Sequence, residues 1–357
     1  MKLLDLPTPA LVIDEELMLR NMSVAEGILE GKKSKLRPHY KSHKCAAIAH
    51  MQIQRGAVGI TCAKLSEAED LIFSGIEDVL IANEIVDPQK IMRAAQLAKL
   101  CHLTVCIDSI ENAKKLSEAA VKADSLLYCY AEYDIGMCRC GVFDPQEYLQ
   151  LAKALQELPN LEYMGIQAYA GHVSHMHTIE ERRAETAKNS AKLRELIDLL
   201  EENGIAVRAI SGGSTGTIDI KAEEGLYTEI QAGSYFMMDN TYRELALPYK
   251  NALYVLATVI HKRPGTAIAD VGVKGLGMDQ ELPAVLRPDG RQIDCGIDVH
   301  EEHMMIHNPS EELEVGDKLL IIPGHCCSTV NLYDKLYLYR DGKVTNRLDI
   351  SARGKSQ

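Results

Sequence analysis

Basic side chains gather in one short stretch near the start of the chain. Residues 36–44 contain two lysines, two histidines and one arginine, and a run typical of a helix follows them. Proline keeps the residue before it out of the helical conformation, so Arg37-Pro38 predicts an extended segment. Side chains alternate between the two faces of a strand, which places Lys41 and His43 on the same face.

Lys41 is the member of this stretch with a specific chemistry open to it. A lysine at the end of a strand, surrounded by cationic and polar groups, can lose its proton and act as a neutral amine nucleophile. That is the chemistry of a Schiff-base lysine, and we expect Lys41 and His43 to be catalytic. The alternative is a basic strand-to-helix loop, which is the stronger interpretation of this stretch taken alone.

A second candidate for chemistry is His325 with Cys327, two positions further on. This spacing allows an imidazole and a thiolate to reach one ion, and the two together favour zinc. Two protein ligands leave room for water and substrate, as a Lewis-acid site requires. The alternative is a buried histidine beside inert thiols, and an isolated His-x-Cys favours that alternative.

Strand-like and helix-like segments alternate along the first two thirds of the chain. Expected strands are the lysine stretch and 10–14, 59–63, 78–82, 103–107, 125–131, 163–169 and 207–211, and the expected helices are 15–29, 45–55, 65–74, 88–100, 110–123, 145–158 and 178–203. This alternation, repeated about eight times, predicts parallel βα units closed into a TIM-like α/β barrel.

After about residue 245 the pattern changes to strands without helices between them. The expected strands are 252–261, 266–271, 318–322 and 332–339, and residues 340–343 are a hairpin candidate. We therefore predict two domains. The barrel covers residues 10–245, and a mostly-β C-terminal domain covers 246–357 together with 1–9 and carries the His325/Cys327 pair.

Polar motifs follow several expected barrel strands, where the active sites of such barrels lie. Residues 211–217 form a glycine-rich turn whose N–H groups and hydroxyls could hold a phosphate. Together with a strand-end lysine, this turn suggests pyridoxal 5′-phosphate (PLP) on a barrel. Arg139 lies between Gly136 and Gly141 after another strand. It is either a surface arginine or a donor to the cofactor, and its position favours the donor.

Composition narrows the class of protein. Hydrophobic residues make up 46% of the 357 residues and charged residues 25%, as in globular, soluble proteins. The formal net charge of −12 argues against a nucleic-acid partner. No apolar run approaches the roughly 20 residues of a membrane span, and the first residues lack a signal peptide's apolar core. Ten cysteines without an export signal predict free thiols and a cytoplasmic location.

Nine motifs taken together resemble one known family, and they span nearly the whole chain. They are Thr8-Pro-Ala10, the 37–44 run, Asp134…Arg139-Cys-Gly141, Tyr169-Ala-Gly-His172, Gly212-Gly-Ser-Thr-Gly216, Gln231-Ala-Gly-Ser-Tyr235…Asp239, Asp270-Val-Gly-Val-Lys274, Glu301-Glu-His303 and Pro323-Gly-His325-Cys-Cys327. In this order they resemble the D-threonine aldolase / D-serine dehydratase family, whose alanine-racemase-like PLP barrel (fold type III) is followed by a C-terminal β-domain.

The resemblance implies roles for individual residues. Lys41 would carry PLP and act as the base at Cα, and Arg139 would contact the O3′ oxygen of the cofactor ring. Either Gln167 or Tyr169 would lie near the ring nitrogen. The implied phosphate-binding residues are Ser214, Thr215, Gly216, Gly233, Ser234 and Tyr235.

The resemblance also supports the metal pair, because His325 and Cys327 match the family's two metal ligands. The expected ion is Zn²⁺, with Mn²⁺ or Mg²⁺ as alternatives. Aldolase members tend to have an aspartate where Cys327 stands, whereas dehydratase members have a cysteine. The histidines at 300, 303 and 307 are candidates for a second metal site.

We accordingly expect a PLP- and zinc-dependent lyase that acts on small β-hydroxy-D-amino acids. Cys327 favours a D-serine or D-threonine dehydratase, which releases a 2-oxo acid and ammonia. The alternative keeps the same site but cleaves Cα–Cβ to glycine and an aldehyde, as a D-threonine aldolase does. An amino-acid racemase and a non-catalytic PLP carrier are further alternatives. The family also implies a homodimer in which the partner's β-domain completes the site.

Overall fold

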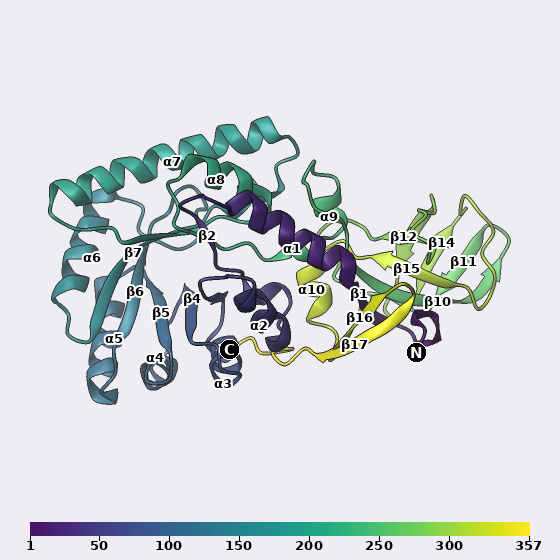
Figure 1. Cartoon of the computed structure of the whole chain (residues 1–357), viewed down its shortest axis with the longest axis horizontal. Coiled ribbons are helices and arrows are strands. Elements are labelled where there is room, and N and C mark those ends of the chain that lie inside the picture. Colours follow the sequence, from purple (N-terminus) through teal and green to yellow (C-terminus); the bar gives the residue numbers. More distant parts are fainter. The chain divides into compact units, whose positions relative to one another are not determined.

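The computed structural model describes all 357 residues and divides into two compact units. The barrel unit comprises Glu26–Lys41, Ile48–Gly233 and Lys355–Gln357, and the β unit comprises Met1–Ala25, Ser42–Ala47 and Ser234–Gly354. In the chain order, therefore, most of the barrel unit is an insertion between segments of the β unit. Figure 1 shows the elements of both units.

Eight parallel strands form the sheet of the barrel unit, in the order β2-β9-β8-β7-β6-β5-β4-β3. A parallel bridge between His39, which follows β2, and Thr61 of β3 connects the first and last strands of this order. The strands are β2 (Lys35–Leu36), β3 (Ile60–Cys62), β4 (Asp78–Glu84), β5 (His102–Ile107), β6 (Leu127–Glu132), β7 (Leu161–Ala168), β8 (Ala209–Gly212) and β9 (Glu229–Ile230). The predicted α/β barrel is confirmed.

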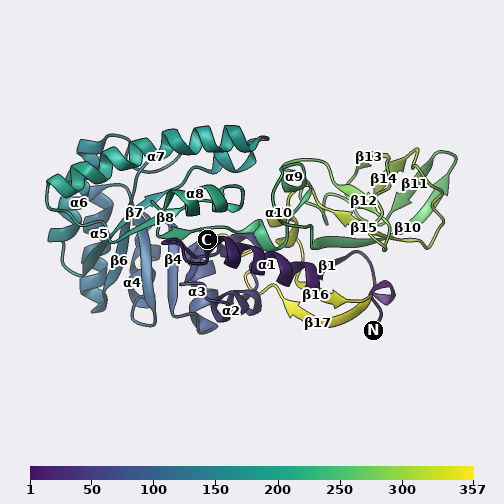
Figure 2. The same ribbon diagram turned by 45° about the horizontal axis from the view of Figure 1, so that its top comes forward.

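Helices connect successive strands and cover the outside of this sheet (Figures 1 and 2). They are α2 (Ala46–Gln54), α3 (Leu65–Phe73), α4 (Pro88–Leu97), α5 (Ile110–Ala123), α6 (Pro145–Glu157), α7 (Ile179–Glu202) and α8 (Ile218–Glu224). The sequence explains where two of these helices begin. Asp87 and Asp144 each accept two backbone N–H groups as N-caps, and a proline occupies the next position in both.

Two sequence expectations differ from this barrel. We expected 10–14 to be its first strand, but β1 (Ala10–Asp14) pairs with β10 and β16 of the β unit. A short, fully apolar run fits the interior of either sheet, so composition does not decide between them. We also expected a strand through Lys41. Instead β2 ends at Leu36, and Tyr40–Ser42 forms the 3-10 turn η2.

A nine-stranded sheet organises the β unit. Its other strands are β10 (Leu253–Arg263), β11 (Thr266–Ala269), β12 (Ala284–Leu286), β13 (Gly296–Val299), β14 (Met304–His307), β15 (Lys318–Ile322), β16 (Lys335–Arg340) and β17 (Lys343–Asp349). The helices are η1 (Leu3–Asp5), η5 (Ser234–Phe236), α1 (Glu15–Leu29, which extends into the barrel unit), α9 (Asn240–Arg243) and α10 (Cys326–Val330). The predicted β-rich C-terminal part and the hairpin at Arg340 and Lys343 are confirmed.

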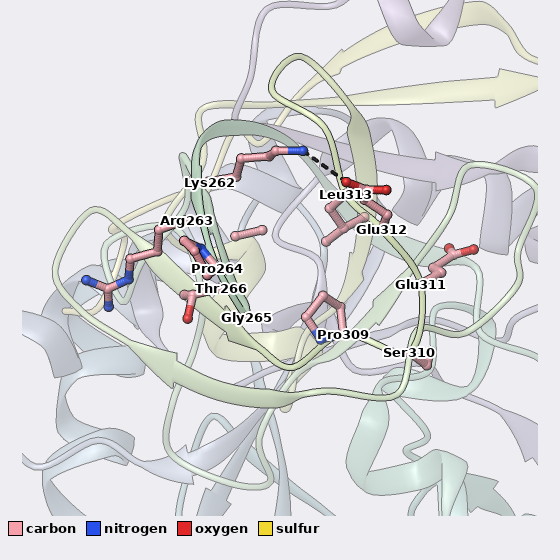
Figure 3. Close-up of a pocket in the computed structure, with 11 residues that line it drawn as sticks. Lys262, Arg263, Pro264, Gly265, Thr266, Pro309, Ser310, Glu311, Glu312 and Leu313 are labelled. Carbon is pink, nitrogen blue, oxygen red and sulfur yellow. Dashed lines mark hydrogen bonds and ion pairs between the residues drawn. The ribbon is translucent and has the colours of Figure 1, made fainter.

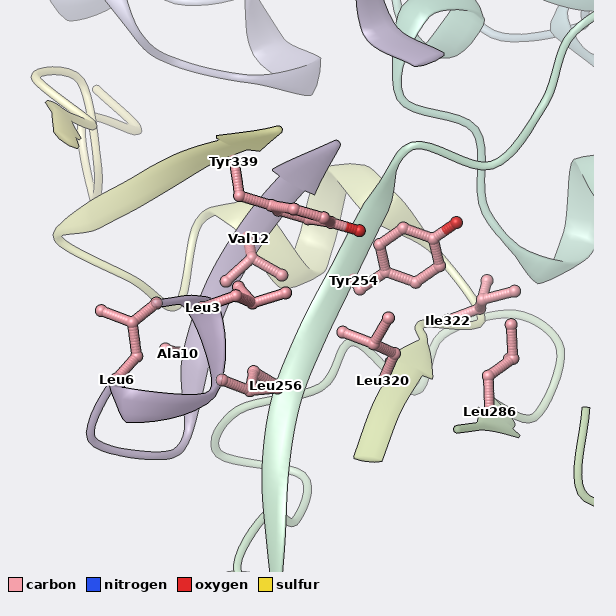
Figure 4. Close-up of a cluster of buried hydrophobic side chains, with 10 residues drawn as sticks. All are labelled: Leu3, Leu6, Ala10, Val12, Tyr254, Leu256, Leu286, Leu320, Ile322 and Tyr339. Atoms are coloured by element: carbon pink, nitrogen blue, oxygen red, sulfur yellow. The ribbon is translucent and has the colours of Figure 1, made fainter. Parts of the chain in front are cut away.

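One face of this sheet has its own apolar core (Figure 4). Side chains from β1, β10, β15 and β16 meet there, and Leu3 and Leu6 cover them. The tyrosines of the cluster, Tyr254 and Tyr339, are each only 8% exposed. Residues from the two ends of the chain therefore share one core, which explains why the N-terminal strand belongs to this unit.

Two further expectations concern the whole chain. All ten cysteines are free thiols, as predicted. Among the helices, none combines the length and the apolar character that a membrane crossing requires.

Candidate active site

A pocket of about 150 Å³ opens at the carboxyl ends of the barrel strands. Its lining residues are His39, Lys41, Ala63, Ala82, Asn83, Arg139, Cys140, Gln167, Tyr169 and Gln231. Three of them directly follow a strand (Ala63, Tyr169 and Gln231) and three lie within its last three residues (Ala82, Asn83 and Gln167), which is where (β/α)8 barrels carry their active sites. Four residues predicted from sequence meet in this pocket: Lys41, Arg139, Gln167 and Tyr169.

Two cationic groups of the pocket approach one aromatic ring. The Nζ atom of Lys41 lies 5.8 Å from the centre of the Tyr169 ring, and the Arg139 guanidinium carbon lies 5.4 Å from it. Both side chains are exposed, and neither forms an ion pair with a carboxylate of the chain. The negative face of an aromatic ring attracts cations, so the Tyr169 ring helps to hold the amine and the guanidinium at the pocket.

Two carboxyl groups lie near Arg139 at the ends of β4 and β6. Burial raises the pKa of Glu132 far above its ordinary value, and the nearby Glu84 raises it further, while Arg139 opposes both effects. A raised pKa favours the uncharged form of Glu132, which attracts the guanidinium less strongly than a carboxylate does. Neither glutamate was predicted from the sequence, which offers only a strand-end position as a signal.

A neutral amide network forms the buried side of the pocket. Gln231 donates through Nε2 to Gln167 Oε1 at 2.8 Å and to Ser211 Oγ at 2.8 Å. These three residues end or follow neighbouring strands of the barrel and are almost fully buried. Gln167 and Tyr169 both line the pocket, so both sequence candidates for the cofactor ring nitrogen remain open. Gln231 was noticed only as part of a family motif.

The glycine-rich turn after β8 fits closely against its neighbours. A Cβ atom on Gly216 would lie 2.3 Å from the Ser174 carbonyl oxygen, and one on Gly212 would lie 2.0 Å from that of Ala168. Gly213 has a φ of +77°, a conformation that favours glycine. Only glycine therefore permits this path. The turn can bring its backbone N–H groups close to a ligand, as a phosphate requires.

Hydroxyl groups complete the turn. Ser214 Oγ lies 3.1 Å from Thr217 Oγ1, and Thr215 opens the 3-10 helix η4 (Thr215–Thr217), which leads directly into α8. These donors and the tight glycine path fit a phosphate group chemically. The phosphate-binding roles of Ser214, Thr215, Gly216, Gly233, Ser234 and Tyr235 stay predictions. In the β unit, Ser234 Oγ lies 3.6 Å from Cys327 Sγ, a contact that the sequence did not suggest.

His43, expected to be catalytic beside Lys41, has different surroundings. Its ring is completely buried and packs edge-on against Phe236, with centroids 5.5 Å apart. Its Nδ1 atom accepts the N–H of Cys45 at 3.3 Å. The alternation argument fails here because η2 replaces the expected strand. These contacts give His43 a packing role, and a catalytic role for it stays a prediction. His39, not predicted as a site residue, lines the pocket instead.

The predicted metal ligands lie where a loop enters α10. His325 is the N-cap residue of this helix, and Cys327 is in its first turn. Hydrogen bonding from the neighbouring Cys326 lowers the pKa of Cys327 well below its ordinary value; burial opposes this, and His325 lowers it further. Burial lowers the pKa of His325, but Cys327 and Asp279 outweigh it and raise that pKa to about 9. The pair therefore has the thiolate that a soft divalent metal prefers.

His325 and Cys327 are the two candidate ligands at this place. No group of three or more His, Cys, Asp or Glu side chains has the geometry to hold a metal ion. An ion bound by His325 and Cys327 would complete its coordination with water and substrate. The same result removes the second metal site considered at residues 300–307. There, His307 Nε2 lies 2.9 Å from Asp298 Oδ2 in an exposed ion pair, and His300 and His303 are exposed.

A larger cavity of about 600 Å³ lies in the β unit, between the β10–β11 hairpin and residues 309–313 (Figure 3). Its Lys262 pairs with Glu312 and Glu314, and its Glu311 pairs with Arg287. The charges lining this cavity are thus largely satisfied by each other. No histidine or cysteine lines it, so we do not assign the chemistry to it.

Family models match most of the chain. Residues 13–241 match the alanine racemase, N-terminal domain, and residues 252–339 match a serine dehydratase domain. Among solved structures, the D-threonine aldolase from Filomicrobium marinum superposes with a TM-score of 0.95 and is 33% identical, covering 100% of this chain and 98% of that one.

Curated relatives match over nearly their full length. The D-threonine aldolase of an Arthrobacter species is 38% identical, and the 3-hydroxy-D-aspartate aldolase of Paracoccus denitrificans (strain Pd 1222) is 37% identical; each match covers 98% of this chain and 93% of the relative. The D-threo-3-hydroxyaspartate dehydratase of a Delftia species is 28% identical over 92% of both chains. Similarity is thus higher to the two aldolases than to this dehydratase.

Proposed function

The chain belongs to the D-threonine aldolase / D-serine dehydratase family, and from that premise we propose that it is a PLP-dependent lyase of β-hydroxy-D-amino acids. The pocket around Lys41 carries this proposal, because it joins the lysine of η2 to an unpaired arginine at the active-site end of the barrel. The glycine-rich turn supports it as a phosphate cradle.

Bound PLP supplies an electron sink for negative charge that develops at Cα. Lys41 would hold the cofactor through Nζ and would move a proton to or from Cα of the substrate. Arg139 would donate to the ring oxygen of the cofactor. The glycine-rich turn would hold the phosphate and so fix the position of the reacting carbon relative to Lys41.

His325 and Cys327 would hold a divalent cation, which would supply Lewis acidity for the substrate's β-hydroxyl group. The chemistry of the two donors supports this assignment, because an imidazole nitrogen and a thiolate together suit zinc. Ser234, 3.6 Å from the sulfur, helps to fix the thiolate. Related proteins support it as well: solved structures of D-threo-3-hydroxyaspartate dehydratase include a cysteine-to-alanine variant in a metal-free form.

We propose aldol cleavage as the reaction, in which Cα–Cβ breaks to give glycine and an aldehyde. The sequence had favoured a dehydratase because of Cys327. The relatives at 37% and 38% identity are aldolases, whereas the dehydratase from Delftia is 28% identical, so the alternative is now better supported. Cys327 favours elimination as the second candidate, because a thiolate ligand selects zinc over the ions that suit a carboxylate.

Product analysis separates the two reactions. Purified protein is incubated with D-threonine and with D-3-hydroxyaspartate, and glycine, aldehyde, 2-oxo acid and ammonia are measured. Glycine with one equivalent of aldehyde supports the aldolase, whereas 2-oxo acid with ammonia supports the dehydratase. The Lys41→Ala variant is the control and should lose at least about a thousandfold in rate. Turnover by this variant would contradict the role of Lys41.

We also propose that the chain is a homodimer, as its family implies. Light scattering coupled to size-exclusion chromatography tests this by comparing the mass in solution with the 39.5 kDa of one chain. A monomeric, fully active enzyme would contradict the idea that a partner's β-domain completes the site.

A further inference from the structure

We propose that Asp279 is a positioning residue for the metal site, a role that rests on the proposed function of His325 and Cys327. In this proposal the Asp279 carboxylate holds the His325 imidazole so that Nε2 is the nitrogen presented to the ion. Ser328 in turn fixes the carboxylate.

The contacts of Asp279 use both of its oxygens. His325 Nδ1 lies 2.7 Å from Oδ2, and Ser328 donates to Oδ1 at 2.5 Å. When the ring is neutral and Nδ1 donates its proton to the carboxylate, the lone pair lies on Nε2, the nitrogen that remains for a metal. A carboxylate behind a metal-bound histidine fixes the ring and makes it a stronger ligand.

The loop that carries Asp279 is held close to α10 by its backbone. Gly277 donates its N–H to Thr329 Oγ1 at 2.9 Å, and the Thr329 hydroxyl donates to the His325 carbonyl at 2.7 Å. Tyr333 donates from its hydroxyl to the Gly275 carbonyl at 2.9 Å. The loop is therefore tied to the same turn that carries the metal ligands, before any ion binds.

Two glycines make this close approach possible. A Cβ atom on Gly277 would lie 1.9 Å from Ser328 Oγ, and one on Gly324 would lie 1.7 Å from the Glu281 carbonyl oxygen. Neither position accepts a side chain without moving the loop. The chain thus uses two of its tightest glycine contacts to bring Asp279 to His325, which is more than an incidental surface ion pair requires.

The β unit contains a matched pair that lacks these features. His307 and Asp298 lie 2.9 Å apart, but the contact is made through Nε2, and the Asp298 side chain is 68% exposed. The Asp279 side chain is 54% exposed, while the side chain of His325 is 19% exposed. Asp298 therefore serves as a control for the loss of an aspartate that pairs with a histidine.

Cobalt binding tests the proposal without reference to turnover. PLP-loaded protein is stripped of metal with a chelator and titrated with Co²⁺, and the thiolate-to-cobalt absorption band and competition with a metal-binding dye give the Kd. Asp279→Ala should weaken binding about 10- to 100-fold. The Kd of Asp279→Asn should lie between those of the unaltered protein and of Asp279→Ala, because its amide oxygen can still accept from Nδ1. Ser328→Ala should weaken Co²⁺ binding by a smaller factor than Asp279→Ala. Asp298→Ala should bind as the unaltered protein does.

The possible failures can be told apart. If the unaltered protein shows no thiolate-to-cobalt band, or if the band survives in Cys327→Ser, the metal site itself is wrong and the role of Asp279 falls with it. If the band behaves as proposed but Asp279→Ala binds Co²⁺ within twofold of the unaltered protein, the positioning role is overturned and the metal site stands. An unchanged PLP absorption spectrum and thermal midpoint show that each variant is folded.

Discussion

The Nζ atom of Lys41 lies 5.8 Å from the centre of the Tyr169 ring, so the proposed nucleophile rests near an aromatic face. Tyr169→Phe keeps that face and should change the Kd for PLP by no more than a few-fold, whereas Tyr169→Ala should weaken binding about tenfold. Titration of the apoenzyme with PLP, followed by absorbance, measures both. Equal losses in the two variants would show that the hydroxyl acts instead, as a partner of the cofactor ring nitrogen.

Replacement of the thiolate ligand should change the choice of metal. Cys327→Asp exchanges a soft sulfur for a hard oxygen, so activity restored by Zn²⁺ should fall relative to activity restored by Mn²⁺. The measurement is the ratio of rates after chelation and addition of each metal. Cys295→Ser, which removes a different half-buried thiol, is the control. An unchanged ratio would mean that Cys327 does not bind the ion.

Arg37 connects the amino-terminal ends of two barrel strands. It donates to Asp78 Oδ1 at 2.6 Å and to Glu229 Oε1 at 2.8 Å, and its side chain is 5% exposed. Arg37→Met leaves a buried carboxylate without a counter-charge and should lower the free energy of unfolding by about 3–5 kcal/mol. Urea denaturation measures the loss. A loss below about 1 kcal/mol would mean that the ion pairs of Arg37 stabilise the fold no more than ordinary surface ion pairs do.

The ion pair between Arg37 and Asp78 also predicts how the free energy of unfolding changes with pH. Burial raises the pKa of Asp78, but His102 and Arg37 outweigh it, so the net pKa is lower than the ordinary 3.8. The contribution of ionised Asp78 to the free energy of unfolding is therefore complete above pH 3.8. It is lost as the pH falls through the lower pKa that Asp78 has in the folded protein. Asp78→Asn should therefore flatten this part of the curve of unfolding free energy against pH. Parallel curves for both proteins would contradict the assignment.

Lys221 is a buried amine whose charge should destabilise the fold. Burial lowers its pKa from 10.5 to about 8, and Nζ has no hydrogen-bond partner, although it lies 3.7 Å from the centre of the Tyr227 ring. Between pH 8 and pH 10.5 the unfolded chain binds more protons than the folded protein, so the free energy of unfolding should rise with pH. Below pH 8 the destabilisation by the buried charge is complete.

Lys221→Met should therefore stabilise the protein at pH 7 by about 2 kcal/mol, the roughly 3 kcal/mol of the shifted pKa less about 1 for the lost ring contact. The gain should disappear near pH 10.5, the pKa of an ordinary lysine. Thermal unfolding across this range measures it. Val121→Met, at an exposed helix position, is the control for adding a methionine. A gain independent of pH would mean that packing, not charge, is responsible.

The sequence predicted the barrel because its strands and helices alternate regularly and are long enough to recognise. It predicted Lys41, Arg139 and Tyr169 from polar motifs after barrel strands, and Gln167 through the family resemblance; all four line the pocket. It did not predict that η2 would replace a strand, and the resulting change of direction separated the surroundings of His43 from those of Lys41. Strand alternation describes side-chain faces only while the strand lasts.

Contacts between distant segments were beyond sequence reasoning. Asp279 precedes His325 by 46 positions, and the contact depends on how a loop lies on α10. Glu84 and Glu132 end two different strands and interact only because the sheet brings these ends together. The affiliation of β1 was likewise decided by partners more than 200 residues away. The sequence identifies such groups one by one and cannot pair them.

The position of β1 has a consequence for the order in which the protein is made. A ribosome synthesises Ala10–Asp14 among the first residues, but its antiparallel partner β10 begins at Leu253 and its parallel partner β16 at Lys335. Nearly all of the barrel unit emerges in between. An apolar strand must therefore wait unpaired through most of translation, which makes nascent chains halted before Lys335 candidates for chaperone binding.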